Sequence, residues 1–191
     1  ILICLAVLTL SLQTACSSSH LEDGDFFFVR NKGAVMPVWV KGNTSSGVFL
    51  INLHGGPGGS SIVGTIVPAM QDLENEFAVV YWDQRASGLS QGNPSPTTFT
   101  IEQYVEDTDL VVDTLAELYE PTSVFLYGHS WGGALGAAYL TDTDRQAKIT
   151  GYIDIASGHN LVAGLPKSVI WLREYATEQI ALGNEAEHWQ N

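Results

Sequence analysis

A Gly-His-Ser-Trp-Gly sequence at residues 128–132 contains the serine with the clearest chemical potential in this chain of 191 residues. It follows an apolar run at 123–127 and precedes small residues at 133–140 that are typical of a closely packed helix. A serine at such a turn is held in a strained backbone conformation that pushes its hydroxyl outward, and the helix N-terminus favours a nearby oxyanion. We therefore predict that Ser130 is a nucleophile. The alternative is a turn serine that only caps the helix.

A glycine-rich turn, His-Gly-Gly-Pro-Gly-Gly at residues 54–59, follows a near-continuous apolar run at 48–53. Such a turn exposes backbone N–H groups that can hold a negatively charged oxygen. Hydrolytic sites of this kind pair a donor from that turn with the N–H of the residue after the nucleophile, so we predict an oxyanion hole made by Gly56 and Trp131. A phosphate-binding loop is disfavoured, because no Gly-Lys-Ser/Thr follows and the net charge is −13.

A third motif, Tyr-Trp-Asp-Gln-Arg-Ala-Ser-Gly-Leu-Ser at residues 81–90, ends the next strand-like run. Asp83 and Arg85 are chemically able to take part in catalysis. We expect them instead to form a charge pair that braces the loop beneath the site.

The charge balance is strongly acidic, with 8 basic and 21 acidic residues and no basic stripe. A polyphosphate would be repelled, so nucleic-acid binding is excluded as a function class. Much of the acid alternates with an apolar face at 101–120, which predicts a solvated helix surface and not a metal site. These acidic residues are Glu102, Glu106, Asp107, Asp109, Asp113, Glu117 and Glu120. We expect neither a metal nor a cofactor.

The elements that position these motifs alternate along the chain. Strand-like runs at 77–82, 123–127 and 149–155 are separated by helix-like stretches at about 61–75, 101–120 and 131–141. This pattern predicts one α/β domain with a mostly parallel, doubly wound sheet. Two short β-rich runs at 25–30 and 35–41, joined by turn residues, predict an antiparallel hairpin before it. Thr100 and Gln103 form a capping box for the helix at 101–120.

Together, residues 54–58, 83–90 and 128–133 resemble the proline iminopeptidase family of α/β-hydrolases in order and spacing. The resemblance covers roughly residues 25–160 and departs at Ala86, where the family usually has glycine. It implies an α/β-hydrolase fold whose N-terminal part spans 25–160. It also implies Ser130 as nucleophile, Gly56 and Trp131 as the oxyanion hole, and the start of a helical cap at 161–191.

The remaining members of a serine hydrolase triad are not evident in the sequence. In this fold the acid and then the histidine follow the nucleophile, but only 61 residues come after Ser130. We interpret His159 and His188 as structural or surface residues, and we expect the His129 side chain to point away from its neighbour's hydroxyl. We therefore expect an incomplete fold, with the acid and the base beyond Asn191 and the 191-residue fragment inactive by itself.

An uncharged apolar run at residues 1–12 begins the chain. It is too short to span a bilayer comfortably, for which about 20 residues are needed, but it suits the apolar core of a secretory signal. Cys16 lies after a small residue and before three serines, where a bacterial lipoprotein signal has its lipidated cysteine. We expect a lipoprotein signal peptide at 1–16, a tether at 17–24, and export to the cell envelope with a lipid anchor in the membrane.

Two alternatives for this segment stay open: secretion after cleavage near Ala15, and an uncleaved membrane anchor. Gln13 departs from the lipoprotein pattern, which usually has a small or aliphatic residue there. Cys4 lies inside the predicted signal, so cleavage would leave Cys16 as the only cysteine and the exported domain without an internal disulfide.

The leading functional hypothesis is a serine hydrolase that cleaves amide or ester bonds through an acyl-enzyme. The resemblance specifies it as an iminopeptidase-like aminopeptidase acting on a small molecule or short peptide. The alternatives are an esterase or carbon–carbon bond hydrolase on the same scaffold, and a non-catalytic hydrolase-fold lipoprotein that binds a ligand or partner.

Overall fold

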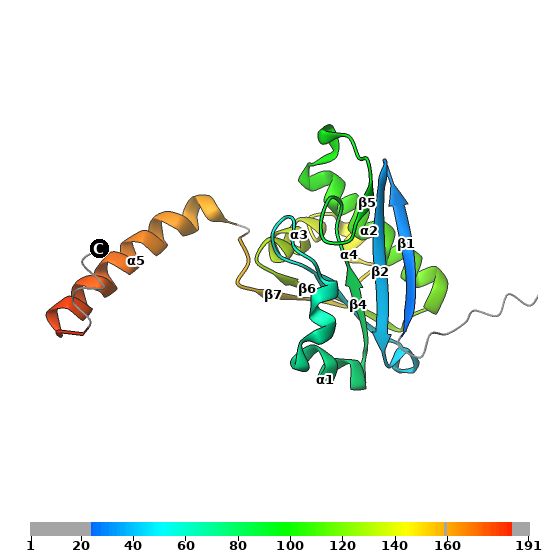
Figure 1. Ribbon diagram of the computed structural model, residues 1–191, viewed down its shortest axis with the longest axis horizontal. Helices are drawn as coiled ribbons and strands as arrows, with labels where there is room; N and C mark the ends of the chain where they lie inside the picture. Colours follow the sequence, from blue (N-terminus) through cyan, green and yellow to red (C-terminus); the bar gives the residue numbers. More distant parts are fainter. Residues whose placement is uncertain (1–23, 159, 185–191) are drawn as a thin grey trace, which may run out of the picture.

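The computed structural model describes residues 24–158 and 160–184, and its elements alternate between strands and helices (Figure 1). The strands are β1 Asp25–Asn31, β2 Ala34–Gly42, β3 Val48–Leu53, β4 Ala78–Trp82, β5 Gln91–Gly92, β6 Ser123–His129 and β7 Gly151–Ile155. The helices are α1 Pro68–Glu76, α2 Ile101–Tyr119, α3 Trp131–Tyr139, α4 Thr143–Gln146 and α5 Leu161–Ala181. Short 3₁₀ turns are η1 Thr44–Ser46, η2 Ile62–Ile66 and η3 Pro96–Thr98.

One mixed sheet runs through the molecule in the order β1-β2-β4-β3-β6-β7, and the short β5 pairs with β2. β1 and β2 form the expected antiparallel hairpin, and β2 also pairs antiparallel with β4. From β4 onward all pairings are parallel. This arrangement confirms the predicted α/β-hydrolase fold with its N-terminal hairpin.

The strand order places two of the three motifs side by side. β3 lies between β4 and β6, and Leu53 at the end of β3 pairs with Gly128 near the end of β6. Because the strands are parallel, the loops that follow them leave the sheet at the same edge. The glycine-rich turn and the serine turn therefore emerge next to each other.

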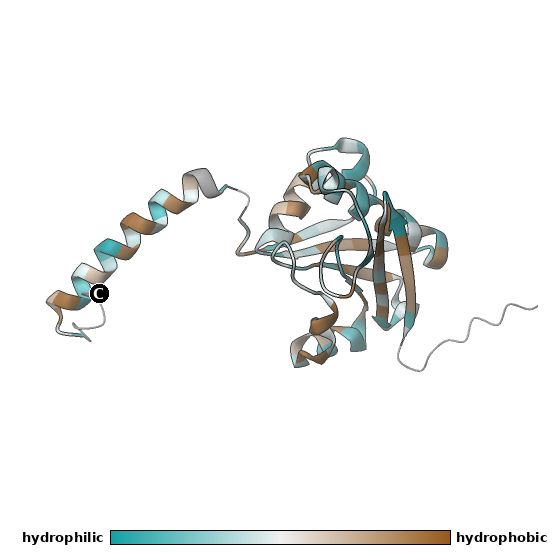
Figure 2. Ribbon diagram, turned by 45° about the horizontal axis from the view of Figure 1, so that its top comes forward, coloured by the Kyte–Doolittle hydropathy of each residue, from teal (hydrophilic) through white to brown (hydrophobic). Residues whose placement is uncertain are grey.

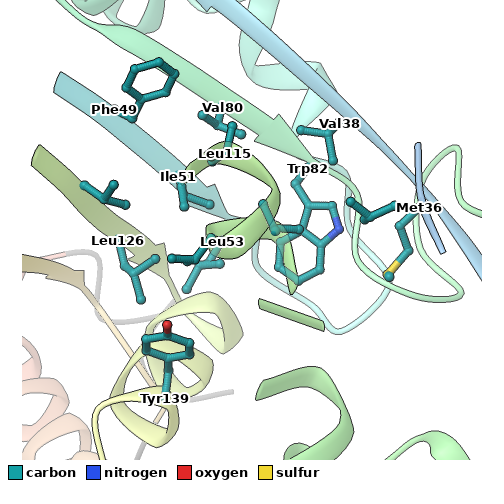
Figure 3. Close-up of a cluster of buried hydrophobic side chains, with 14 of the residues drawn as sticks. Met36, Val38, Phe49, Ile51, Leu53, Val80, Trp82, Leu115, Leu126 and Tyr139 are labelled. Atoms are coloured by element: carbon teal, nitrogen blue, oxygen red, sulfur yellow. The ribbon is translucent and has the colours of Figure 1, made fainter. Parts of the chain in front are cut away.

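The main core lies between the sheet and the pair of helices α2 and α3 (Figure 3). Alternate residues of β3, Phe49, Ile51 and Leu53, are fully buried against side chains such as Leu115 of α2 and Leu135 of α3. On the other face, α1 contributes Met70 to a smaller cluster with β4. All five β4 residues are buried, which explains the continuous apolar run of that strand. This core holds fixed the edge from which the motifs emerge.

Most predicted elements are confirmed within one or two residues, and the differences have local causes. The helix expected at 61–75 is split into η2 and α1, and Pro68 occupies the first position of α1, where proline is well tolerated. Thr100 caps α2 by accepting from the Gln103 N–H at 3.3 Å. The Gln103 side chain does not close the predicted capping box but donates to Asp107 at 3.2 Å. β5 and α4 were too short to stand out in the sequence.

α5 projects away from the sheet and exposes hydrophobic side chains along its length (Figures 1 and 2). Leu165, Ile170 and Trp171 are each more than half exposed. The expected helix at the start of the cap is thus present, while its role as a cover for the site stays a prediction. No helix in the described part of the chain has the length and apolar character needed to cross a membrane. The predicted signal peptide, Cys16, His159 and His188 lie outside the described residues.

Candidate active site

Ser130 occupies a strained turn between β6 and α3, with φ 56° and ψ −117°. Its backbone is held firmly in this conformation. The N–H donates to the Ile155 carbonyl at 3.0 Å, and the carbonyl accepts from the N–H groups of Gly133 and Ala134 at 3.1 and 3.2 Å. Non-glycine residues in such conformations cost about 1–3 kcal/mol and persist where the surrounding structure over-determines them, often at functional sites.

The Ser130 side chain does not use its position at the start of α3 to cap the helix. A capping serine accepts a hydrogen bond from an N–H in the first turn. Ser130 makes no such bond, and within the described residues its half-buried hydroxyl has no hydrogen-bond partner. The alternative of a serine that only caps the helix is therefore not supported.

The glycines beside Ser130 allow close approach of β3 and α3. A Cβ at Gly132 would overlap the Leu53 carbonyl oxygen, and one at Gly128 would lie 2.5 Å from the Gly132 carbonyl oxygen. Either contact would force the elements apart. These glycines thus hold the serine turn against the end of β3, as the motif predicts.

The glycine-rich turn packs directly on the serine turn. A Cβ at Gly55 would lie 3.4 Å from the Ser130 Cβ and 3.3 Å from the His129 carbonyl oxygen. Gly56 follows with φ +133°, a conformation that residues with a side chain rarely adopt. Within residues 24–158, neither the Gly56 N–H nor the Trp131 N–H donates to another backbone group. Among these residues, the two predicted oxyanion donors thus have no backbone acceptor for their hydrogens.

Gln84, from the third motif, joins both loops through its side chain. It is fully buried, its Nε2 donates to the His54 carbonyl at 3.0 Å, and its Oε1 accepts from the Trp131 indole Nε1 at 2.9 Å. Its sequence position alone gave no sign of this role, because the contacts join residues 30 and 47 positions away.

The His54 ring is fixed as one neutral tautomer. Its Nε2 accepts from the Gln84 N–H at 3.0 Å, so the proton is on Nδ1, which lies 2.8 Å from the Gly55 carbonyl oxygen. Burial lowers the pKa of His54, and the Gly55 hydrogen bond and the charge of Asp83 only partly oppose this effect. His54 is thus a buried, neutral support of the turn, and its ring hydrogen bonds go to Gly55 and Gln84.

The predicted pairing of Asp83 with Arg85 is wrong, because each has another partner. The Asp83 carboxylate accepts from the Ser60 hydroxyl and from the N–H groups of Ser61 and Leu89, all at 2.8 Å. It therefore ties the turn after β3 to the loop after β4. These contacts brace the site, as expected of Asp83, but through neutral donors.

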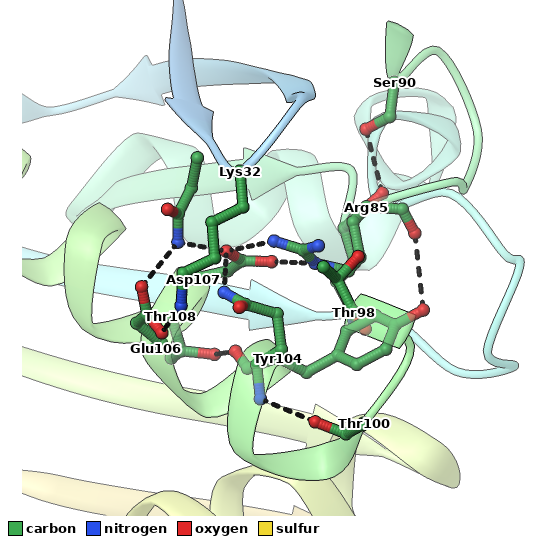
Figure 4. Close-up of polar contacts among 12 residues, drawn as sticks. Lys32, Arg85, Ser90, Thr98, Thr100, Tyr104, Glu106, Asp107 and Thr108 are labelled. Atoms are coloured by element: carbon green, nitrogen blue, oxygen red, sulfur yellow. Dashed lines mark hydrogen bonds and ion pairs between the residues drawn. The ribbon is translucent and has the colours of Figure 1, made fainter. Parts of the chain in front are cut away.

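Arg85 pairs with Asp107 of α2 (Figure 4). Its Nε and Nη2 atoms lie 2.5 and 2.8 Å from the two carboxylate oxygens, and both side chains are fully buried. Asp107 was expected on a solvated helix surface, and for this residue the expectation is wrong. The acidic pattern of α2 could not reveal which carboxylate meets a cation from another loop.

Two open cavities lie near the ends of β6. One of about 330 Å³ adjoins the site and is lined by residues that include Gly55, Tyr127 and His129, but not Ser130. Another of about 580 Å³ lies between the end of α2 and the start of β7, and Asp113 and Lys148 are among its lining residues. The smaller cavity offers space for part of a ligand beside the serine turn.

The structure brings the predicted nucleophile and oxyanion donors together but does not complete a triad. No histidine in the described residues hydrogen-bonds to the Ser130 hydroxyl, and the exposed His129 lines the neighbouring cavity. The arrangement can hold a carbonyl carbon against the serine oxygen.

Sequence comparison relates the chain to aminopeptidases. Residues 47–188 match the family described as serine aminopeptidase, S33. "Probable aminopeptidase YbaC" of Bacillus subtilis is 40% identical over 93 residues, which are 48% of this chain and 29% of the relative. A proline iminopeptidase of Thermoplasma volcanium is 33% identical over 136 residues, which are 71% of this chain and 42% of the relative.

One solved structure that is similar to this chain comes from a related protein. The crystal structure of a proline iminopeptidase-related protein from Thermus thermophilus superposes with a TM-score of 0.58 and 33% identity, over 70% of this chain and 45% of that one. The chain thus spans less than half the length of each of these three proteins. The family match covers most of the chain and all three motifs, and the sheet order and serine turn agree with it. The chain belongs to the serine aminopeptidase S33 family of α/β-hydrolases.

Proposed function

We propose that the protein is a serine hydrolase in which Ser130 attacks the carbonyl carbon of an amide or ester bond. The observation that carries the proposal is the Ser130 conformation: a strained backbone with a hydroxyl that is not engaged in capping α3. Family membership supports hydrolytic chemistry, and the strain supports this residue as its centre.

In the proposed mechanism, the Ser130 oxygen adds to the carbonyl carbon while a histidine accepts the hydroxyl proton. The carbonyl oxygen becomes an oxyanion that the N–H groups of Gly56 and Trp131 stabilise. The intermediate collapses to an acyl-enzyme as the amine or alcohol leaves with the proton, and water then releases the acid. The histidine and its acidic partner are expected outside the described residues.

The more specific proposal is an aminopeptidase of the iminopeptidase type, which removes an N-terminal residue from a short peptide. The support comes from the names of the relatives, which include an aminopeptidase and a proline iminopeptidase. An ester substrate is the main competing outcome, because the scaffold itself does not select the leaving group.

The test uses the full-length protein and two measurements. A fluorophosphonate probe should label the wild type and fail to label Ser130→Ala, while Ser45→Ala, which changes an exposed serine, should label normally. Prolyl arylamides, other aminoacyl arylamides and short acyl esters are then compared as substrates. Labelling that survives Ser130→Ala would overturn the proposed nucleophile. A preference for acyl esters would favour the esterase, and a lack of both labelling and turnover would favour a non-catalytic binding protein.

A further inference from the structure

Gln84 lies at the junction of the two loops that carry the proposed oxyanion donors. Its side chain binds the His54 carbonyl on one side and the Trp131 indole on the other, at 3.0 and 2.9 Å. We propose that Gln84 is a positioning residue that sets the direction of both donors, Gly56 and Trp131. This inference rests on the proposed function, because it assigns a role at the same site.

On the glycine-rich side, the control of direction passes through the His54 ring. The Gln84 N–H orients the ring by donating to Nε2, and Nδ1 then donates to the Gly55 carbonyl. The Gly55 carbonyl and the Gly56 N–H belong to the same peptide group, and a trans peptide group is planar with these two bonds pointing in opposite directions. Holding the carbonyl oxygen therefore aims the Gly56 hydrogen.

The Gln84 side chain adds a second hold on this turn. Its Nε2 donates to the His54 carbonyl, which belongs to the preceding peptide group. Two successive peptide planes are thus fixed from Gln84, one directly and one through the ring. A glycine-rich turn has wide conformational freedom, so it needs such external bonds to keep one geometry.

On the helix side, the bond to Gln84 fixes the Trp131 side chain. The indole also packs edge-on against Tyr104 of α2, with ring centroids 5.5 Å apart. Trp131 is the first residue of α3, so its N–H lies in the first turn, where backbone hydrogens have no partner in the helix. Locking the indole restricts how this residue rotates and hence where its N–H points.

An amide is the one side-chain group of this length that satisfies both neighbours. Nε2 must donate to a carbonyl, and Oε1 must accept from an indole N–H. A carboxylate would face the His54 carbonyl with no hydrogen to donate, and a thioether would satisfy neither partner well. Gln84→Glu therefore removes the bond to the His54 carbonyl but can keep the one from the Trp131 indole, and Gln84→Met disrupts both, with little change in volume.

Gln103 provides the matched control. It is also a buried glutamine, 6% exposed, and its side chain donates to Asp107 and not to either of the loops that carry Gly56 and Trp131. Gln103→Met should lower stability because it removes a buried amide and its hydrogen bond, but it should leave the N–H groups of Gly56 and Trp131 in place. Comparing the two methionine variants separates a positioning role from a purely structural one.

The experiment measures kcat, KM and melting temperature of full-length wild type, Gln84→Met, Gln84→Glu, Gln103→Met and Trp131→Phe on the best substrate. Misaimed donors weaken transition-state binding more than substrate binding, so we expect kcat to fall by about 10- to 100-fold in both Gln84 variants with KM changed by less than about 3-fold. Trp131→Phe removes one of the same bonds, so we expect a smaller fall in kcat that does not add to the effect of Gln84→Met.

Several results would overturn the positioning role: a kcat for Gln84→Met close to wild type, a fall matched by Gln103→Met, or a loss confined to KM. If Gln84→Met does not fold, the kcat and KM of Gln84→Glu and Trp131→Phe test the positioning role by the same criteria. Fluorophosphonate labelling that persists in Ser130→Ala would instead contradict the proposed nucleophile. The two ideas therefore fail in different ways.

Discussion

The guanidinium of Arg85 and the carboxylate of Asp107 form a two-point ion pair with both side chains fully buried. The pair joins the loop after β4 to the middle of α2, and the Asn31 and Gln103 side chains also donate to the same carboxylate. A buried charge is tolerated when it is paired and hydrogen-bonded in this way. The loop that carries Gln84 is thereby anchored from below.

Removing one charge of this pair should be costly. Asp107→Asn leaves the Arg85 cation buried without its counter-ion, so we expect the free energy of unfolding in urea to fall by about 3–5 kcal/mol. Glu106→Gln is the control, because its pair with Lys32 is solvent-exposed and should contribute no more than about 1 kcal/mol. Equal effects of the two substitutions would contradict the structural importance of the buried pair.

The strain at Ser130 predicts an opposition between stability and activity. Ser130→Gly relieves the positive φ, so we expect the free energy of unfolding to rise by about 1 kcal/mol after the entropic cost of glycine is subtracted. Ser130→Ala keeps a Cβ and should show no such gain. Both variants should lose fluorophosphonate labelling. If glycine and alanine variants are equally stable in urea titrations, the turn does not store the strain that its backbone angles indicate.

A similar argument applies to Ala86, which adopts φ 52° in an exposed position of the loop after β4. The resemblance to the proline iminopeptidase family indicated glycine at this position, and the left-handed conformation explains why. We expect Ala86→Gly to increase the free energy of unfolding by about 0.5–1 kcal/mol. Ala134→Gly is the control, because Ala134 lies in α3 and glycine should there decrease the free energy of unfolding. A destabilised Ala86→Gly variant would contradict this explanation.

The sequence was most informative where structure depends on neighbours in the chain. The serine turn, the glycine-rich turn and the Thr100 cap follow from short patterns, and the order of apolar runs was enough to predict a mostly parallel sheet, though not its strand order. The partners of Arg85 and Gln84 were not predictable, because they lie far away in the sequence and depend on how the loops and helices pack in three dimensions. Alternating acids on α2 look alike in the sequence, yet Asp107 alone is fully buried against a cation.

The predicted lipid anchor can be tested apart from the catalytic site. If Cys16 is lipidated, cells grown with an alkyne-labelled fatty acid should yield labelled wild-type protein in the membrane fraction. Cys16→Ser should lose the label, while Cys4→Ser should keep it, since that residue lies inside the predicted signal. Labelling of both variants would contradict anchoring through Cys16. Soluble, unlabelled wild type would favour ordinary secretion, and unlabelled wild type retained in the membrane would favour an uncleaved anchor.

The neutral His54 ring should make the domain sensitive to mild acid. Its pKa is lowered in the folded state by burial, so below about 6.5 the unfolded chain takes up a proton that the folded chain resists. The stabilising contribution of His54 is therefore complete above pH about 6.5 and declines as the pH falls toward the lowered folded pKa. Protonation would also place a hydrogen on Nε2. That hydrogen would face the Gln84 N–H, from which Nε2 now accepts a hydrogen bond.

Urea unfolding at pH 7.5, 6.5 and 5.5 tests this linkage by comparing wild type with His54→Gln. The stability difference between them should shrink as the pH falls, by at most about 1.4 kcal/mol per pH unit for one group. His129→Gln, which changes an exposed histidine, is measured in parallel as a control for the substitution itself. A His54→Gln difference that stays constant from pH 7.5 to 5.5 would mean that His54 does not couple folding to protonation. The glycine-rich turn would then keep its geometry in acid, and any loss of labelling there would have to come from the proton acceptor of Ser130.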